Sequence, residues 1–499
     1  MKKLILNLVI TLAILISPLF FTSCTADTNL SALSKNLTNY NISIDFNCQS
    51  KQFTASQQVD YINSTDSILT EVRFHLYPNA FKTKDNPLSP VSSFSFERAY
   101  KNGFDSGYIV INEVKVQDKN VQIKFDGVEN SILVVELDSK LYPDERVNIQ
   151  MQYIVKVPNV CHRFGYDDNT INVGNFYPIA CVFENGAFVQ DGYHYNGDPF
   201  YSEMANYFVD ITYDKGFYLA STGEKRYDNS VKDRKEKQIC SALAVRDFAF
   251  VLSDKFIEQK FTINNIDVTY LHYNDQDVEQ SIDVIANCLS YFNNLIGQYP
   301  YKTYTVVQAN FLHGGMEYPN LVLISDEIQS RDDINNVIVH ETAHQWFYNI
   351  IGNNEYSEAW LDEGLTEYVT TMFFQAYDKY GIDYNQTIGT MLSSYQMFVE
   401  IYTDVFSTID TSMNRPLSSF ASEPEYTYCV YIKGVLMLDN LRSYIGDSAF
   451  MLGLKNYFNE NKFKIAKQHH FIAAFNKASG KDISKLIEPW LNGSAILGC

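Results

Sequence analysis

The stretch VIVHETAHQWF, residues 337–347, contains the pattern H-E-x-x-H at His340, Glu341 and His344. Residues four apart on a helix lie one above the other, so both histidine side chains can point at one metal ion. Glu341 follows the first histidine directly, which places its carboxylate beside such an ion, where it can act as a base toward water. Because so short a pattern also occurs by accident, the residues around it decide whether it is a metal site.

The stretch lies in a segment with the features of a helix. Asp332 or Asp333 can cap its first turn, and Gly352 stands where such a helix would end. Apolar residues recur at helical spacing, which predicts one buried face. The members of this stripe are Ile334, Val337, Ile338, Phe347 and Ile351. We therefore expect one helix between Asp332 and Gly352.

A catalytic zinc ion needs a third protein ligand and one open coordination position. The sequence NNEYSEAWLDEGLTEYVTTMFF (353–374) predicts a short loop and a second helix that carries Glu363, with eighteen residues between His344 and this glutamate. That distance allows the chain to return antiparallel and bring the carboxylate to the ion. Two histidines and one glutamate with an open position favour zinc over other divalent ions. Glu367, one turn further on, could orient a ligand, but we interpret it as an exposed surface carboxylate.

HETAH at 340–344, followed by WLDEG at 360–364, resembles the gluzincin metallopeptidases of the aminopeptidase N type, a family that also contains the leukotriene hydrolase. Two further motifs match in the family's order. GGMEY at 314–318 resembles its G-x-M-E-N exopeptidase motif, and YIKG at 431–434 resembles its Y-x-K-G segment. Weaker similarity covers DPFYSEMANYFVDITY (198–213), VRDFAFVLS (245–253) and a terminal segment ending in Pro489-Trp490-Leu491.

The resemblance implies a role for each matching residue. His340, His344 and Glu363 would bind one Zn²⁺ and leave a position for water. Glu341 would take a proton from that water and pass it to the leaving amine. Tyr431 would donate a hydrogen bond to the oxyanion, where charge develops in the transition state.

The G-x-M-E-N-like motif implies how the amino end of a peptide substrate is held. Glu317 would pair with the free α-amino group of the peptide. The backbone at Gly314 and Gly315, with Met316 beside them, would bind the peptide as an added strand. The substrates implied by the resemblance are therefore peptides.

Three features depart from the family pattern. Tyr318 replaces the usual Asn, which affects how the amino end is recognised. The Gln or Glu that lines the first specificity pocket in relatives has no clear counterpart here; Glu184 and Gln190 lie in the corresponding region, but we interpret both as surface residues. Only nine residues follow Trp490, so we expect the large C-terminal helical domain of longer relatives to be absent and the cleft to be more open.

Four of the seven histidines outside the motifs are considered as possible site residues. His313 abuts GGMEY and is a candidate cleft residue. His194, His469 and His470 lack ligand spacing, and we interpret them as structural.

The wider pattern predicts an α+β multidomain chain. Val147, Ile149, Met151, Tyr153 and Val155 alternate with mostly polar residues, as in a half-buried strand, and similar strands continue to about residue 250. We predict an N-terminal antiparallel β-sandwich domain over 37–250. Helical spacing becomes clear between residues 277 and 297, and the rest of the chain is mostly helical. The resemblance to the gluzincins implies that 251–499 form a thermolysin-like, mainly helical zinc catalytic domain.

The N-terminus resembles a secretory leader. Lys2 and Lys3 precede a short apolar run that ends near Ser23-Cys24, and LFFTSC (19–24) resembles a bacterial lipobox. We expect a lipoprotein-type signal peptide over 1–24, a polar tether over 25–36, and a lipid anchor at Cys24 on the outer face of a bacterial membrane. Plain cleavage with secretion and an uncleaved anchor are the alternatives.

Composition excludes other classes. A formal net charge of −20 argues against a nucleic-acid partner, because phosphate binding needs a basic face. No C-x-x-C pair, G-x-S-x-G elbow, P-loop or dinucleotide fingerprint is present in the sequence. The eight cysteines allow no prediction of pairing.

The leading hypothesis is an extracytoplasmic zinc aminopeptidase. An endopeptidase or oligopeptidase that uses an open cleft is the close alternative. A non-catalytic surface-binding protein on the same fold is the alternative from another class, and epoxide hydrolysis rests on family analogy alone.

Overall fold

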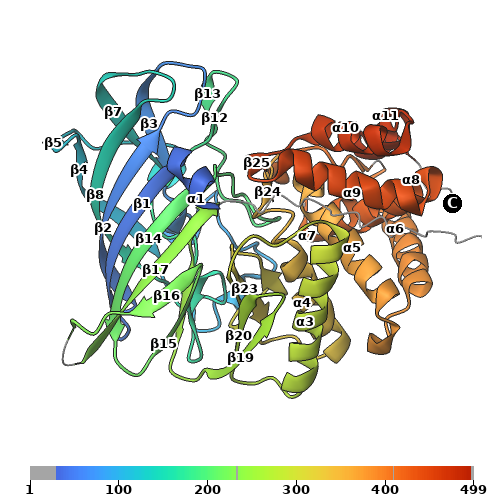
Figure 1. Cartoon of the computed structure of the whole chain (residues 1–499), viewed down its shortest axis with the longest axis horizontal. Coiled ribbons are helices and arrows are strands. Elements are labelled where there is room, and N and C mark those ends of the chain that lie inside the picture. Colours follow the sequence, from blue (N-terminus) through green and yellow to red (C-terminus); the bar gives the residue numbers. More distant parts are fainter. Residues whose placement is uncertain (1–29, 232–233, 408, 496–499) are drawn as a thin grey trace, which may run out of the picture.

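The computed structural model describes residues 30–231, 234–407 and 409–495. The predicted signal peptide and Cys24 lie outside the described residues. In the segment predicted as a tether, Leu30–Leu33 (α1) and Ser34–Asn36 (η1) form short turns, and Leu30 packs against the core. Figure 1 shows a β-rich part built from the first half of the chain and a helical part built from the second half.

The N-terminal part is built on an eight-stranded sheet with the strand order β16-β17-β14-β1-β2-β8-β4-β5. The alternation predicted for 147–155 is confirmed, because Val147, Ile149, Met151, Tyr153 and Val155 are all buried. Neighbouring strands are antiparallel except β1 and β14, which pair in parallel. The strands are β1 (Thr38–Asn47), β2 (Gln52–Ile62), β4 (Tyr108–Val116), β5 (Lys119–Asn120), β8 (Arg146–Lys156), β14 (Ala205–Asp214), β16 (Glu224–Tyr227) and β17 (Lys235–Val245).

Two four-stranded sheets complete the sandwich, in the orders β15-β18-β10-β9 and β11-β3-β7-β6. Phe46 of the large sheet meets Phe250 of the first small sheet edge-on, with ring centroids 6.1 Å apart. Such contacts fill the space between the sheets. The strands are β3 (Leu69–His75), β6 (Lys124–Asp126), β7 (Ile132–Leu141), β9 (Phe164–Tyr166), β10 (Ile171–Val173), β11 (Ile179–Ala180), β15 (Tyr218–Ser221) and β18 (Phe250–Ser253), with a separate hairpin of β12 (Phe183–Glu184) and β13 (Ala187–Phe188).

The catalytic part begins with a five-stranded sheet in the order β19-β20-β21-β23-β22. The change from the sandwich to this sheet falls between Ser253 and Ile257. The strand β22 lies at the sheet edge and carries Gly315 and Met316 of the GGMEY motif. The strands are β19 (Ile257–Ile263), β20 (Ile266–His272), β21 (Thr303–Ala309), β22 (Gly315–Met316) and β23 (Leu321–Ser325).

Helices make up most of the remaining chain. The apolar spacing predicted after residue 277 is confirmed in α3, where Ile285, Leu289 and Phe292 are buried. No helix among the described residues is long and apolar enough to cross a membrane. The helices are α3 (Val278–Leu295), α4 (Arg331–Ala343), α5 (Glu363–Ala376), α6 (Tyr384–Phe406), α7 (Glu423–Tyr426), a π-helix η7 (Thr427–Ile432), α8 (Lys433–Ile445), α9 (Asp447–Asn461), α10 (Gln468–Ser479) and α11 (Ser484–Leu491).

The helix with the H-E-x-x-H pattern is shorter than predicted. Its N-cap is Ser330, whose hydroxyl accepts a hydrogen bond from the backbone N–H of Asp333, so neither Asp332 nor Asp333 caps it. It ends at Ala343, and the chain then forms tight turns up to the short strand β24 (Ile351–Gly352). Trp346 contributes to this change of direction by donating its indole N–H to the Gly297 carbonyl at 2.7 Å.

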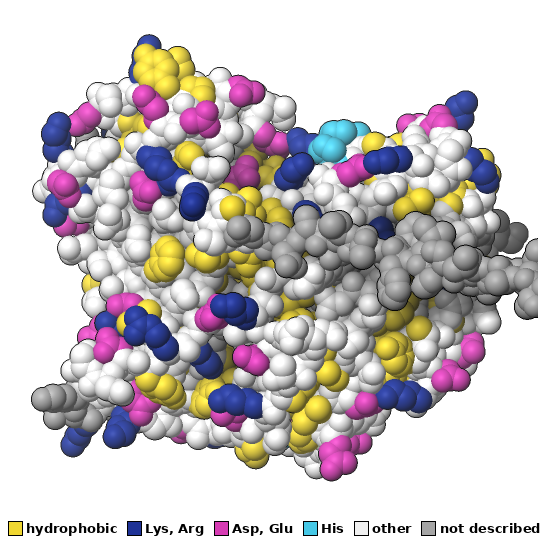
Figure 2. Space-filling view, viewed as in Figure 1, with side chains coloured by type: hydrophobic (Ala, Val, Ile, Leu, Met, Phe, Trp, Pro, Cys, Tyr) yellow, Lys and Arg dark blue, Asp and Glu magenta, His cyan; other side chains and the backbone are white. Residues whose placement is uncertain are grey.

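Neither the charged residues nor the cysteines of the described residues mark a special site. On the face shown in Figure 2, lysine and arginine side chains are interspersed with aspartate and glutamate. The six cysteines within the described residues are free and buried. Most of the predicted functional residues line a cavity between the two parts of the molecule.

Candidate active site

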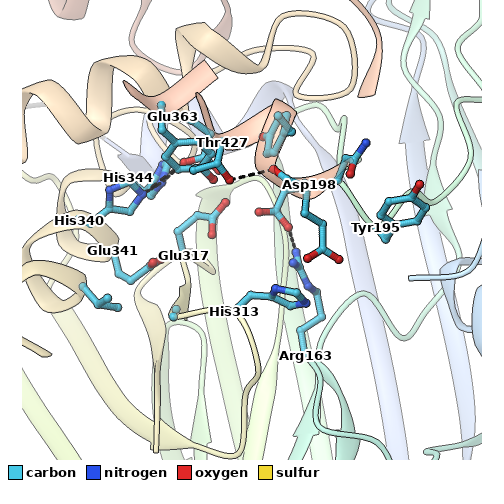
Figure 3. Close-up of a pocket in the computed structure, with 18 of the residues that line it drawn as sticks. Arg163, Tyr195, Asp198, His313, Glu317, His340, Glu341, His344, Glu363 and Thr427 are labelled. Atoms are coloured by element: carbon cyan, nitrogen blue, oxygen red, sulfur yellow. Dashed lines mark hydrogen bonds and ion pairs between the residues drawn. The ribbon is translucent and has the colours of Figure 1, made fainter. Parts of the chain in front are cut away.

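A cavity of about 370 Å³ lies between loops of the sandwich and the catalytic part. One wall carries the motif residues of α4, α5, β22 and η7, and the other is formed by loops of the sandwich. Figure 3 shows His340, His344, Glu363, Glu341 and Glu317 on the first wall. The fold therefore brings four motifs that are far apart in sequence to one place.

The three predicted metal ligands converge on one point. The Nε2 atoms of His340 and His344 lie 3.0 Å apart. Oε2 of Glu363 lies 3.3 Å from the first of these atoms and 3.2 Å from the second. A tetrahedral ion with ligand bonds of about 2.0–2.1 Å holds its ligand atoms about 3.3 Å apart. The spacing of these atoms matches a bound zinc ion.

The opposite ring nitrogens explain why the Nε2 atoms can act as ligands. Nδ1 of His340 lies 2.8 Å from Glu367 Oε2, and Nδ1 of His344 lies 2.7 Å from Asp362 Oδ1. A carboxylate accepts a hydrogen bond, so each Nδ1 carries the proton and each Nε2 presents its lone pair. Two lone pairs and the Glu363 carboxylate in close contact repel each other unless a cation lies between them. The donor set therefore fits a divalent metal.

Electrostatics lead to the same conclusion. Burial lowers the pKa of His340, but hydrogen bonds to Glu363 and Glu367 raise it more, to about 10. Burial also raises the pKa of Glu363, but the charge of His344 and hydrogen bonds from both rings lower it well below its usual value. The cluster thus holds positive charge strongly, and metal binding would release a proton from it.

Asp362 and Glu367 are site residues that sequence reasoning missed or misjudged. The interpretation of Glu367 as an exposed surface carboxylate is wrong, because its side chain is 17% exposed and contacts His340. Its position one turn after Glu363 was the available signal, since such residues share a helix face. The role of Asp362 was not predicted, although it directly precedes a ligand.

Glu341 lies against the glycine strand. A Cβ atom added to Gly315 would come within 2.3 Å of Glu341 Oε1, so this approach requires a glycine. Burial raises the pKa of Glu341 to about 8, which the charge of His340 opposes and the nearby Glu317 carboxylate supports. This pKa suits a group that takes up and releases a proton near neutral pH.

The GGMEY motif divides between the cavity and the core. Gly314, Gly315 and Glu317 line the cavity, whereas the Met316 side chain is fully buried in the hydrophobic core. Side chains alternate along a strand, so Met316 and Glu317 point in opposite directions. Of the predicted substrate-binding residues, Met316 thus offers no side chain to the cavity.

Glu317 is buried in the cavity wall with an unsatisfied carboxylate. It is 3% exposed, and its Oε1 atom has no hydrogen-bond partner among the described residues. One of its carboxylate oxygens lies within 4.8 Å of a His344 ring nitrogen. Burial raises its pKa, and the charge of His344 opposes this effect. Such a carboxylate is a binding site for a cationic group of a ligand.

Tyr431 reaches the cavity from the π-helix η7. Its ring lies nearly parallel to that of His340 with centroids 6.0 Å apart, and Tyr426 packs against it edge-on at 5.7 Å. Burial and the nearby Glu363 raise its pKa well above the usual value, so its hydroxyl remains a hydrogen-bond donor. π-Helical turns are often found at functional sites.

The glycines of WLDEG and YIKG set the distance between Tyr431 and Glu363. A Cβ atom on Gly434 would come within 2.8 Å of the Gly364 Cα atom, so α5 and α8 meet backbone to backbone at this point. The buried Lys433 holds the start of α8 by donating to the carbonyls of Thr411 and Trp490 at 2.7 and 2.8 Å. Lys433 and Gly434 of YIKG therefore help to place the tyrosine.

The sandwich wall was not predicted from the sequence. It carries the buried ion pair of Arg163 and Asp198, which Figure 3 shows on the side of the cavity opposite the metal ligands. Asp198 begins the weakly similar segment 198–213, whereas no motif marks Arg163. Contacts between residues so distant in sequence give no local pattern.

The remaining candidates divide between the cavity and the surface. His313 lines the cavity, and so does His194, although it was interpreted as structural. Glu184 pairs with Lys467 at 2.6 Å and Gln190 accepts a hydrogen bond from Arg73 at 2.8 Å. Neither of these two residues lines the cavity.

Comparisons with known proteins agree with the site. Residues 280–490 match the peptidase family M1 domain. Two His and one Glu ligands, with a glutamate beside them, define the class of the zinc metallopeptidases. Residues 280–490 are thus similar to the M1 peptidases, whose members include proteins named aminopeptidase N.

Individual relatives share part of their length with this chain. Probable aminopeptidase 2 of Sulfurisphaera tokodaii is 24% identical over 233 residues, which cover 42% of this chain and 28% of that protein. Aminopeptidase N of Lactococcus lactis subsp. lactis is 26% identical over 237 residues, covering 42% and 26%. The matches thus span about a quarter of the length of these relatives.

Solved structures share the fold over almost the whole chain. The M1 zinc metallopeptidase from Deinococcus radiodurans superposes with a TM-score of 0.61 at 14% identity, covering 93% of this chain and 95% of that chain. A mutant of that enzyme, described as bound to a Tyr-Ser-Ala substrate, superposes with the same score. The predicted order of a sandwich followed by a helical catalytic part is confirmed.

Proposed function

We propose that this protein is an extracytoplasmic zinc-dependent aminopeptidase, which removes the first residue of peptides with a free amino terminus. The observation that carries the proposal is the placement of Glu317. Its buried carboxylate lies within 4.8 Å of a His344 ring nitrogen and lacks a partner for Oε1 among the described residues. A substrate ammonium group bound there lies a short distance from the metal ligands, which selects the first peptide bond.

His340, His344 and Glu363 would hold the zinc ion, with Glu367 and Asp362 orienting the two imidazoles. Bound zinc supplies Lewis-acid chemistry: it polarises the scissile carbonyl and lowers the pKa of water. Glu341 accepts the proton of the attacking water on its carboxylate. It then donates this proton to the nitrogen of the leaving amine, a transfer that its raised pKa favours.

Tyr431 acts on the other side of the scissile carbonyl. Its hydroxyl stays protonated in the buried site and donates a hydrogen bond to the oxygen that becomes negatively charged. Because the stacked contact with His340 and the edge contact with Tyr426 fix its ring, this donor is positioned before the reaction begins.

The rest of the peptide has room to leave the cavity. A second groove shares Gly314, Asn336 and Val337 with the cavity and continues toward Arg98 and Glu327. This groove supports substrates longer than a dipeptide. On the opposite side of the cavity, the Arg163–Asp198 pair forms part of the wall.

The location is proposed from the N-terminal sequence. Lys2 and Lys3, the apolar run and the lipobox-like LFFTSC suggest export and a lipid anchor at Cys24. Labelling of cells with a radioactive fatty acid tests this part. Incorporation that is lost in a Cys24→Ala variant supports the anchor, and equal incorporation in both proteins contradicts it.

The activity is tested with one peptide in two forms, free and N-terminally acetylated, incubated with the zinc-loaded chain. We expect cleavage of the free peptide only, and none by a Glu341→Gln variant that still binds zinc. Internal cleavage of both forms identifies an endopeptidase and rejects the proposal. No turnover of either form with zinc bound identifies a binding protein.

A further inference from the structure

The side chain of Tyr318 points away from the cavity and into the interface with the sandwich. This residue directly follows Glu317 and stands where the G-x-M-E-N motif has Asn. Its hydroxyl donates a hydrogen bond to Asn175 Oδ1 at 2.7 Å, and the residue is 1% exposed. Tyr318, the residue next to Glu317, is thus hydrogen-bonded to the sandwich domain.

Asn175, which binds the Tyr318 hydroxyl, is itself hydrogen-bonded to the buried carboxylate of Asp247. Its Nδ2 atom donates to Asp247 Oδ2 at 2.6 Å. The other oxygen of Asp247 accepts hydrogen bonds from the Tyr177 hydroxyl at 2.7 Å and the Phe248 N–H at 2.6 Å. All of these groups are buried, and hydrogen bonds to a carboxylate in such surroundings are short and strong.

Gly174 leaves room for the phenol. A Cβ atom at this position would come within 1.8 Å of the Tyr318 hydroxyl oxygen and 2.3 Å of Cζ. Tyr318 is therefore confined by backbone on one side and fixed by the hydrogen bond to Asn175 on the other. Its ring has little freedom to shift without moving the sandwich.

A second anchor holds the same segment on the catalytic side. Gln345, which directly follows His344, donates from Nε2 to the carbonyls of Glu317 at 3.3 Å and Tyr318 at 3.2 Å. Its Oε1 atom accepts the N–H of Asn320 at 2.8 Å. The backbone around Glu317 is thus held on one side by Gln345 and on the other by the hydrogen bond of Tyr318 to the sandwich.

We propose that Tyr318 is a positioning residue that, through Asn175 and Asp247, fixes the Glu317 carboxylate at the distance from the metal ligands that selects a free amino terminus. This inference rests on the proposed aminopeptidase function and adds to it that the sandwich contributes to recognition of the amine. The Glu317 Oε1 atom lacks a partner among the described residues, so its position depends on the backbone on either side. A displacement of about 1 Å at such a group can reduce the rate about 100-fold.

The test measures how well the full-length zinc-loaded protein discriminates between a peptide and its des-amino analogue, in which hydrogen replaces the α-amino group. Tyr318→Phe keeps the ring and removes the hydroxyl. Asn175→Gly removes the acceptor, and glycine tolerates the positive φ of 49° found there. Tyr213→Phe is the matched control, because this buried tyrosine of the sandwich accepts a hydrogen bond from Gln238 at 2.8 Å, away from the cavity.

We expect both variants to reduce the ratio of kcat/KM for the two substrates by about 10-fold or more, with zinc content and Tm close to those of the control. In a Glu317→Gln background, Tyr318→Phe should change the ratio no further, because both changes act on one group. An unchanged ratio in both folded variants, or equal losses on both substrates, overturns the positioning role alone. A wild-type protein that cleaves both substrates equally overturns the proposed function and this inference with it.

Discussion

Glu341 and Gly315 are in contact within one wall of the cavity, and a Cβ atom at the position of the glycine would collide with the glutamate side chain. A Cβ atom there would lie 2.3 Å from Glu341 Oε1. The edge strand that would bind the peptide and the base that would act on its first bond are thus fixed relative to each other. We predict that Gly315→Ala reduces kcat about 10- to 100-fold by displacing the carboxylate, while zinc content is unchanged.

The control for this change is Gly389→Ala in α6, where an added Cβ atom has no neighbour within 4 Å. Steady-state kinetics should show no loss for the control. If Gly315→Ala is as active as Gly389→Ala, Glu341 does not depend on this contact.

The carboxylates behind the histidines should tune metal affinity. We predict that Glu367→Gln and Asp362→Asn each weaken zinc binding about 10- to 100-fold, because each removes a charged acceptor from a ligand's Nδ1–H. Glu363→Ala should weaken it more, since it removes a ligand. Competition with a chromophoric chelator measures these affinities, with the exposed Glu400→Gln as the control. Unchanged affinity in Glu367→Gln would restore its interpretation as a surface residue.

Tyr431 should act on kcat. We predict that Tyr431→Phe, which keeps the ring contacts to His340 and Tyr426, lowers kcat about 100- to 1,000-fold with little change in KM. The comparison is Tyr444→Phe, a half-exposed tyrosine of α8. A loss that appears only in KM would place the hydroxyl in substrate binding and not in the transition state.

The buried Asp247 should make stability depend on pH. Burial raises its pKa from 3.8 to about 7 in the folded protein, partly offset by the hydrogen bond from Tyr177. A carboxyl group whose pKa is higher in the folded state stabilises the protein fully when the pH is below its pKa in the unfolded state. This stabilisation is lost as the pH rises through its pKa in the folded state. Between pH 4 and pH 7.5, the free energy of unfolding of the wild type should therefore fall by up to about 4 kcal/mol more than that of Asp247→Asn.

Chemical denaturation of both proteins at both pH values measures how much the free energy of unfolding of each changes with pH. An effect of the substitution that is the same at both pH values does not enter this comparison. The same shift in both proteins would show that Asp247 is not protonated in the folded state.

The cluster of His340, His344 and Glu363, which could hold a metal ion, was predictable from the sequence because its geometry is local. His340 and His344 are one helical turn apart, and Glu363 needed only a loop long enough for the chain to return. The sandwich was predictable for a similar reason, since its strands alternate buried and exposed residues. What depends on three-dimensional contact was not accessible in this way.

The error at Glu367 was avoidable, because this residue lies one helical turn after Glu363 and shares the helix face that carries that predicted ligand. The early end of α4 is followed by a tertiary contact, in which the indole N–H of Trp346 donates to the Gly297 carbonyl. The Arg163–Asp198 pair and the partner of Tyr318 join residues far apart in sequence, and no local pattern records such pairs.

The most direct test of the central claim is a time course of one unmodified decapeptide with the zinc-loaded protein, followed by mass spectrometry. The account predicts a series of products that each lack further residues from the amino end, with a carboxyl terminus that stays intact, and a much slower series for Glu317→Ala. Fragments from a cut inside the peptide at early times, formed equally by wild type and Glu317→Ala, would contradict it.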